Sequence, residues 1–191
     1  MSATPPSPSV FADRFAPRPM DGQPLEPELL LDIAAALARA RTLWSDRVRH
    51  DRPERHAVRL VADGRFEAWL IGWPPGHRTT SHDHGESVGA LAVVEGSLLE
   101  RTVDADGPRA RRLSPGSVSP LGAGLVHDVA TPVDAPATSI HVYSPPLATM
   151  TFYEDGSGVP DRVLAVADET PLLDRRELAR LLHPSAAAGR G

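Results

Sequence analysis

The sequence predicts a mainly β fold, a sandwich or barrel of short strands, with a helix at each end. Three observations indicate this class. Short alternating or β-rich runs fill the middle of the chain, glycine and proline punctuate them at close intervals, and helical periodicity is confined to the two flanks. With 191 residues, 41% of them hydrophobic and 24% charged, the chain can form one domain with a sizeable core.

The first element in chain order is a proline-rich tail over residues 1–26, which we expect to lie extended or disordered on the surface. Pro27 suits the first turn of a helix, and apolar residues at helical spacing follow it. They predict an amphipathic helix over about 27–47, with its apolar face formed by Leu30, Ile33, Leu37 and Trp44.

The β region is expected over about 56–153, because its apolar runs have strand length and end at glycines or at Pro-Gly pairs. Beyond it, Asp174 comes before a glutamate and regularly spaced leucines, a pattern that predicts a capped helix over about 174–183. Residues 184–191 form a small, polar tail. We therefore expect a single domain over residues 27–183.

Composition excludes several kinds of chemistry. The chain has no cysteine, so disulfides and cysteine nucleophiles are excluded, and all 20 basic residues are arginine, so a lysine Schiff base is excluded too. The net charge is −5 and no segment is strongly basic, so nothing suggests nucleic-acid binding, and no protein partner is indicated. No stretch is apolar enough to span a membrane and the N-terminal residues lack a secretory signal, so we expect a cytoplasmic location.

His82-Asp-His84 is the most informative pair among the eight histidines. On a strand, side chains two residues apart point to the same face, so both imidazoles can converge on one ion. A third histidine from a neighbouring strand would complete a set that suits zinc, copper, iron and nickel alike. Taken alone, the pair could also be two polar residues on an exposed strand.

The spacing around this pair resembles the first motif of the cupin superfamily, in which a glycine precedes HxH, a glutamate follows it and a second glycine closes the strand. Gly76 and Gly96 occupy the glycine positions, but the glutamate position holds Gly89. The resemblance implies a cupin barrel, a double-stranded β-helix with one metal ion. Without the glutamate, the metal would keep more open positions for a substrate and O₂.

The third metal ligand is expected at His127. The preceding segment 120–124, PLGAG, resembles the turn of the second cupin motif and would bring the next histidine to the barrel rim. His141 is the rival candidate. A separate pattern, GESVG at residues 85–89, fits the GxSxG nucleophile elbow of hydrolases, but that motif needs a helix after it and a β-rich run follows here.

Two longer stretches resemble the cysteine dioxygenase family. One is WPPGHRTTSHDHGESVGALAVVEGSLLE at residues 73–100, and the other is SIHVYSPP at residues 139–146. The resemblance covers roughly residues 55–155, and the second stretch is its most specific part. It implies one ferrous ion, Fe²⁺, per chain, with O₂ and a small thiol as substrates. The implied reaction is the oxidation of L-cysteine to cysteine sulfinic acid.

Carried over by position, the resemblance also implies residue roles. Tyr143 would place its hydroxyl near substrate and oxygen, His141 would orient Tyr143, and Ser139 would support His141. The metal ligands would be His82, His84 and His127.

Arg59 would bind the substrate carboxylate through a guanidinium that matches it with two hydrogen bonds, and Arg55 is the alternative. Family members that act on 3-mercaptopropionate often have glutamine at the position of Arg59, so arginine favours cysteine. Animal members have a cysteine at the Gly89 position, cross-linked to the tyrosine; this chain has none, so Tyr143 must be unmodified. A dioxygenase for another thiol acid, such as 3-mercaptopropionate, and a non-catalytic metal-binding cupin remain the alternatives.

Overall fold

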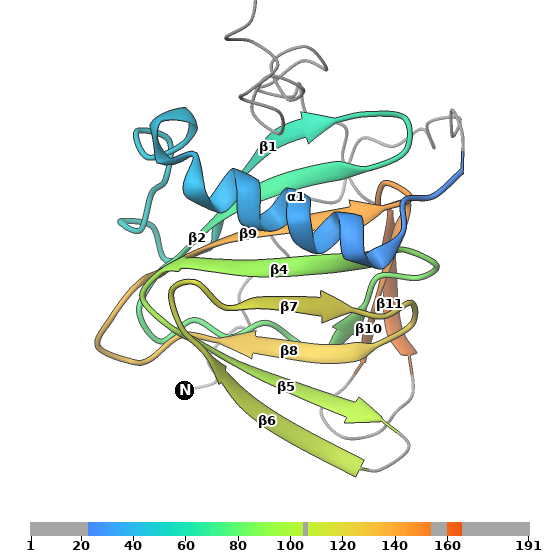
Figure 1. Ribbon diagram of the computed structural model, residues 1–191. Coiled ribbons are helices and arrows are strands. Elements are labelled where there is room, and N and C mark those ends of the chain that lie inside the picture. Colours follow the sequence, from blue (N-terminus) through green and yellow to red (C-terminus); the bar gives the residue numbers. More distant parts are fainter. Residues whose placement is uncertain (1–22, 105–106, 154–159, 166–191) are drawn as a thin grey trace, which may run out of the picture.

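The computed structural model describes residues 23–104, 107–153 and 160–165. Its strands form two antiparallel sheets, and a helix packs on the outer face of the first sheet (Figure 1). The mainly β class predicted from the sequence is confirmed. The expected C-terminal helix over 174–183, the tail over 184–191 and most of the N-terminal tail lie outside the described residues. Within the described ranges, no helix has the length and apolar character needed to cross a membrane.

The first sheet has five strands in the order β1-β2-β9-β4-β7. Its strands, in that order, are β1 (His56–Ala62), β2 (Glu67–Trp73), β9 (Ala137–Ser144), β4 (Val88–Glu95) and β7 (Val118–Leu121).

The second sheet has six strands in the order β11-β10-β3-β8-β5-β6. It consists of β11 (Pro160–Ala165), β10 (Thr149–Tyr153), β3 (His82–Asp83), β8 (Val126–Ala130), β5 (Leu98–Asp104) and β6 (Gly107–Leu113). The strand region thus begins at the expected residue and continues beyond residue 153, because β11 adds an edge strand next to β10.

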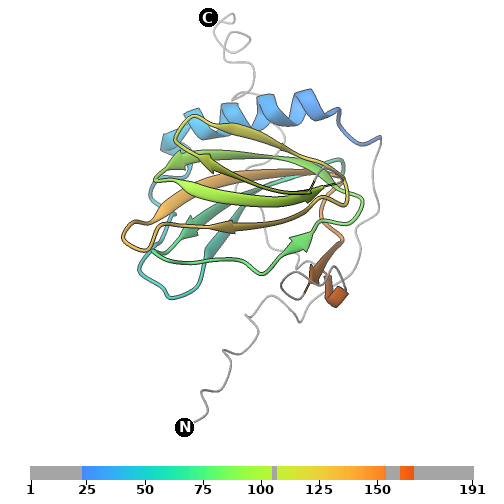
Figure 2. The same ribbon diagram turned by 90° about the horizontal axis from the view of Figure 1, so that it is seen from below.

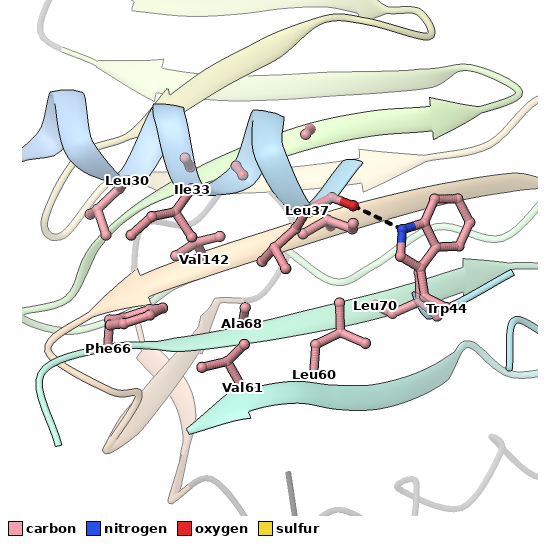
Figure 3. Packing of buried hydrophobic residues seen from close by; sticks show 14 of the residues in the cluster. Leu30, Ile33, Leu37, Trp44, Leu60, Val61, Phe66, Ala68, Leu70 and Val142 are labelled. Atoms are coloured by element: carbon pink, nitrogen blue, oxygen red, sulfur yellow. Dashed lines mark hydrogen bonds between the residues drawn. The ribbon is translucent and has the colours of Figure 1, made fainter. Parts of the chain in front are cut away.

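Helix α1 runs from Pro27 to Arg39, and a short 3₁₀ turn, η2, covers Arg41–Leu43, so the helix ends before the expected residue 47. Trp44 lies beyond the helix, and its indole nitrogen donates to the main-chain carbonyl of Leu37 at 2.9 Å (Figure 3). Carbonyls in the last turn of a helix have no partner within the helix. The carbonyl of Leu37 also accepts from the main-chain N–H of Ala40 at 3.1 Å, so the indole is a second donor at this helix end, and its ring stays in the core.

The first sheet has an apolar layer on each face, and β9 shows how they are divided. Ile140 and Val142 pack in the cluster beneath α1, which lies across this sheet (Figure 2). Side chains alternate along a strand, so Ser139, His141 and Tyr143 face the second sheet. Between the sheets lies a second apolar cluster, which includes Trp69, Trp73, Leu91, Leu98, Leu113 and Val129. One strand therefore carries core packing on one face and polar groups on the other.

Candidate metal centre

Three histidines converge between the two sheets. His82 lies on β3 and is the cross-strand partner of His127 on β8, and His84 follows two residues after His82. One nitrogen from each ring lies within 4.8 Å of the other two, and all three residues are buried. The carboxylate of Asp83, between the first two, accepts hydrogen bonds from the main-chain N–H of Gly85 and from the hydroxyl of Tyr153.

The chemistry of this cluster fits a metal ion. Nε2 of His127 is buried and has no hydrogen-bond partner among the residues that the structure describes, which is unusual for a buried polar atom. Burial, together with the neighbouring histidines, holds the pKa values of His82 and His84 well below the ordinary value. Neutral imidazole is the form that binds metals. Three neutral nitrogens could hold one ion and leave positions open on it.

His141, the rival candidate for the third ligand, does not join the cluster. Its Nε2 lies 2.9 Å from the hydroxyl of Ser139, and its Nδ1 lies 3.0 Å from the hydroxyl of Tyr143. Burial, aided by the charges of His127 and Arg55, lowers the pKa of His141 to about 3. The ring is therefore neutral, and one of its nitrogens donates a hydrogen bond while the other accepts one.

Trp73 gives this hydrogen-bond chain a direction. Its indole nitrogen lies 2.8 Å from the hydroxyl of Ser139, and an indole N–H can only donate. The Ser139 hydroxyl then donates to Nε2 of His141, since a buried hydroxyl proton without an acceptor is unfavourable. Nδ1 of His141 consequently carries the ring proton and donates to Tyr143. The proton of Tyr143 is left pointing toward His84, whose Nε2 lies 3.3 Å from the tyrosine oxygen.

Gly89 makes room for the ring of Tyr143, its cross-strand partner. A Cβ at Gly89 would lie 2.6 Å from the carbonyl oxygen of Val142 and 2.9 Å from Cδ1 of Tyr143. Neither the glutamate of the cupin motif nor a cysteine would fit there unless these neighbours shifted. Burial raises the pKa of Tyr143 above its ordinary value, so the hydroxyl keeps its proton.

The structure distinguishes the two candidate arginines. The guanidinium of Arg59 lies 2.7 Å from the carboxylate of Glu67, and both side chains are buried. Arg55 precedes β1, and its guanidinium lies 5.0 Å from the ring centroid of Trp73. No carboxylate in the described ranges pairs with Arg55. Its positive charge contributes to the lowered pKa values of the site histidines His82, His84 and His141. Of the two arginines, Arg55, the alternative candidate, is therefore the one whose charge lowers these pKa values.

Glu100 contacts the site, although no sequence motif singles it out. Its carboxylate lies 3.0 Å from Nδ1 of His127, and the residue is fully buried. The signal that could have found it is its alternation with Leu98, which puts a charged side chain on the core-facing side of a strand. Only the pairing of β5 with β8 brings it to the histidine.

The GxSxG pattern at residues 85–89 is not a nucleophile elbow in this fold. Strand β4 begins at Val88, so a strand follows the serine where the hydrolase motif needs a helix. Ser87 is buried, and its main-chain N–H donates to the carbonyl of His84 at 3.2 Å. The turn thus connects the metal-site histidines to the first sheet.

Comparison with known proteins identifies the family. The family model described as cysteine dioxygenase type I matches residues 20–156, well over half of the chain. The chain belongs to this cysteine dioxygenase family. The proteins named cysteine dioxygenase type 1 from Rattus norvegicus and Mus musculus are each 26% identical to it over 113 residues, or 53% of this chain. The match covers 56% of each relative, so the chain spans about half the length of these curated cysteine dioxygenases.

A solved structure supports the fold assignment. A protein from Klebsiella pneumoniae, described as having a double-stranded β-helix domain, superposes with a TM-score of 0.51 at 18% identity. The match covers 58% of this chain and 94% of the other. At this identity the likeness concerns the fold alone. Together with the two sheets, it confirms the cupin class for this member of the cysteine dioxygenase family.

Proposed function

We propose that this chain is a non-haem iron thiol dioxygenase that oxidises L-cysteine with O₂ to cysteine sulfinic acid. The observation that carries the proposal is the position of the Tyr143 hydroxyl, 3.3 Å from one nitrogen of a buried three-histidine cluster. A cluster that only stored metal would need no oriented hydroxyl beside it. Membership in the cysteine dioxygenase family supports the same reaction class.

The reaction needs no outside reductant. Both oxygen atoms of O₂ are added to sulfur, so the sulfur loses four electrons as the thiol becomes a sulfinic acid, and O₂ gains four. Ferrous iron held by His82, His84 and His127 would supply adjacent open positions for the thiolate and O₂. Holding the two reactants side by side removes most of the entropy cost of their encounter.

Tyr143 would act as a fixed hydrogen-bond donor to the reacting groups. Its raised pKa keeps the hydroxyl protonated, and the chain from Trp73 through Ser139 and His141 leaves that proton available. A donor held in place before the reaction stabilises developing negative charge without reorganisation. This role assigns Tyr143 as a catalytic residue and His141 as its positioning residue.

Arg55 would bind the substrate carboxylate. Its charge acts on Tyr143 and on the site histidines, whereas Arg59 is engaged by Glu67. A guanidinium binds a carboxylate through two parallel charge-assisted hydrogen bonds. The proposed substrate is therefore a small thiol that carries a carboxylate, with its sulfur directed toward the histidines.

The test is O₂ consumption by the ferrous-loaded protein with L-cysteine, with the sulfinic acid quantified. We expect one sulfinic acid per O₂ consumed, and loss of turnover in His84→Ala. Faster O₂ consumption with 3-mercaptopropionate than with cysteine would support a thiol dioxygenase but contradict cysteine as its substrate. If the protein binds iron but consumes no O₂ with any thiol acid, the dioxygenase proposal is refuted and the protein is a non-catalytic metal-binding cupin.

A further inference from the structure

The three histidines of the cluster are supported by different kinds of partner. Nδ1 of His82 lies 2.8 Å from the main-chain carbonyl of Thr80, whereas Nδ1 of His127 lies 3.0 Å from the carboxylate of Glu100. The contact of His84 is on its other ring nitrogen, with the hydroxyl of Tyr143. Within the described ranges, His127 is thus the cluster histidine whose partner carries a charge.

Strand pairing explains how Glu100 reaches this position. On the β5–β8 ladder, Thr102 lies opposite His127 and Glu100 lies opposite Val129. Glu100 is therefore the diagonal neighbour of His127 on the same face, a separation that a long side chain spans. The core-facing register of β5 directs its carboxylate to Nδ1 of the histidine.

The carboxylate is itself held from the other side. On β6, Arg111 is the cross-strand partner of Glu100, and its Nε donates to Oε2 at 2.7 Å. The guanidinium also donates to the hydroxyl of Ser119 on β7. The guanidinium of Arg111 pairs with Oε2 of Glu100, while Oε1 faces Nδ1 of His127, and an ion pair of this kind favours the ionised carboxylate. Each carboxylate oxygen thus has a partner, as a buried charge requires.

The contact determines which nitrogen of His127 is free. An ionised carboxylate can only accept, so Nδ1 of His127 carries the ring proton and Nε2 keeps its lone pair. Nε2 is the atom that is buried without a hydrogen-bond partner in the described part of the chain. The lone pair is therefore available at the point where His82 and His84 converge.

We propose that Glu100 is a positioning residue of the metal centre, which selects the metal-binding tautomer of His127 and increases the electron density that this ligand donates. The inference rests on the proposed metal site but not on the identity of the thiol. Arg111 holds the carboxylate of Glu100 in place. Because the side chain of Arg111 is 48% exposed, it connects the buried centre to the surface of β6. Carboxylate partners of this kind orient metal-binding histidines and raise their basicity.

The decisive experiment measures metal affinity without turnover. Ferrous ion is titrated anaerobically into the full chain against a chromophoric chelator, for the parent and for Glu100→Gln, which keeps the shape and removes the charge. We expect the affinity of Glu100→Gln to fall roughly 10–100-fold. The matched control is Glu95→Gln, which removes a carboxylate that pairs with Arg41 away from the cluster and should leave the affinity unchanged.

A second readout separates positioning from general damage to the fold. In the zinc-loaded parent, we expect the Nδ1 proton of His127 to give a downfield NMR signal, and Glu100→Gln should shift that signal upfield or remove it. The thermal midpoint of the metal-free protein should change far less than the metal affinity. Arg111→Met should weaken metal binding in the same direction by a smaller factor. Arg112→Met, a change at the next residue of β6 that removes a hydrogen bond to Ser97, should not.

The results distinguish this proposal from the proposed function. Parent-like ferrous affinity in Glu100→Gln, with the NMR signal unchanged, overturns the role of Glu100 whether or not the parent oxidises thiols. Weakened affinity in Glu100→Gln supports that role even if the parent oxidises no thiol. The dioxygenase assignment stands or falls separately on O₂ uptake.

Discussion

The hydroxyl oxygen of Tyr143 lies 3.3 Å from Nε2 of His84, so a hydroxyl from the first sheet and a histidine of the candidate metal centre beside the second sheet meet at one point. Neither sheet could form this arrangement alone. The stiff β9 backbone holds the donor, and the turn that follows β3 holds the histidine.

Tyr143→Phe should lower kcat by roughly 10²-fold, because it removes a fixed donor at the reacting groups and leaves the ring in place. The ferrous content should stay at that of the parent, since the metal ligands are unchanged. Steady-state O₂ uptake together with iron analysis checks both expectations. A variant that retained the parent kcat would exclude the hydroxyl from the chemical step.

Trp73→Phe should lower kcat by about five- to tenfold while KM changes little. Without the indole donor, the hydroxyl of Ser139 can reverse its hydrogen bond with His141. The preference for one direction of the hydrogen-bond chain, worth ~1 kcal/mol, is then lost. Trp44→Phe is the control, because it also removes an indole donor but lies in the other apolar layer, away from that chain. Equal effects from the two substitutions would indicate packing and count against a directional role.

Arg55→Met should lower kcat/KM for L-cysteine by roughly 10–100-fold, chiefly through KM, since it removes charge-assisted hydrogen bonds worth about 1.5–3 kcal/mol. Turnover of cysteamine, a thiol without a carboxylate, should be unaffected. Steady-state kinetics with both thiols tests this expectation. Equal losses for the two thiols would refute carboxylate binding by Arg55.

Arg59→Met provides the contrast, because it should act on stability more than on substrate binding. Removal of the guanidinium leaves the buried carboxylate of Glu67 without its ion-pair partner, a change that typically costs about 3–5 kcal/mol. Urea unfolding should detect this loss, whereas Arg55→Met should unfold close to the parent. The reverse pattern would restore Arg59 as the carboxylate-binding residue.

The stability of the metal-free protein should fall as the pH drops from about 6.5 toward 3. His141 titrates at about 3 in the folded chain, while an unperturbed histidine titrates near 6.5, so protons bind the unfolded state first. The free energy of unfolding contributed by this residue is full above pH 6.5 and declines by up to about 1.4 kcal/mol per pH unit below it. Urea unfolding across this range should give a shallower pH dependence for His141→Gln. An unchanged slope would contradict the buried, neutral state of His141.

The convergence of His82 and His84 can be predicted from the sequence because it depends on local spacing, and a turn motif singles out His127. Two histidines that are two residues apart on a strand share one face, and the PLGAG turn leads directly into the strand that carries His127. The choice between Arg55 and Arg59 could not be made in this way. The two residues are four apart, so alternation favours neither, and the ion pair of Arg59 depends on the pairing of β1 with β2, which brings Glu67 to Arg59.

The role of Glu100 and the end of α1 each depended on a contact that no sequence pattern shows. Glu100 follows two leucines in a strand-like run, and its role appears only when β5 pairs with β8. Trp44 matched the helical spacing, yet it packs from a turn and closes the helix through the carbonyl of Leu37. The spacing of apolar residues indicates which face of a helix is buried but does not indicate the residue at which the helix ends.

The three tryptophans are divided between the two apolar layers, so their fluorescence reports on two different parts of the fold. Trp44 lies in the layer under α1, while Trp69 and Trp73 lie between the sheets, where the ring of Trp73 is 6.2 Å from that of His141. A transition-metal ion at the histidines would quench the two tryptophans between the sheets more strongly than Trp44, which lies on the other face of the first sheet. Intrinsic fluorescence can therefore follow metal loading without a label, with Trp44 as the reference emitter.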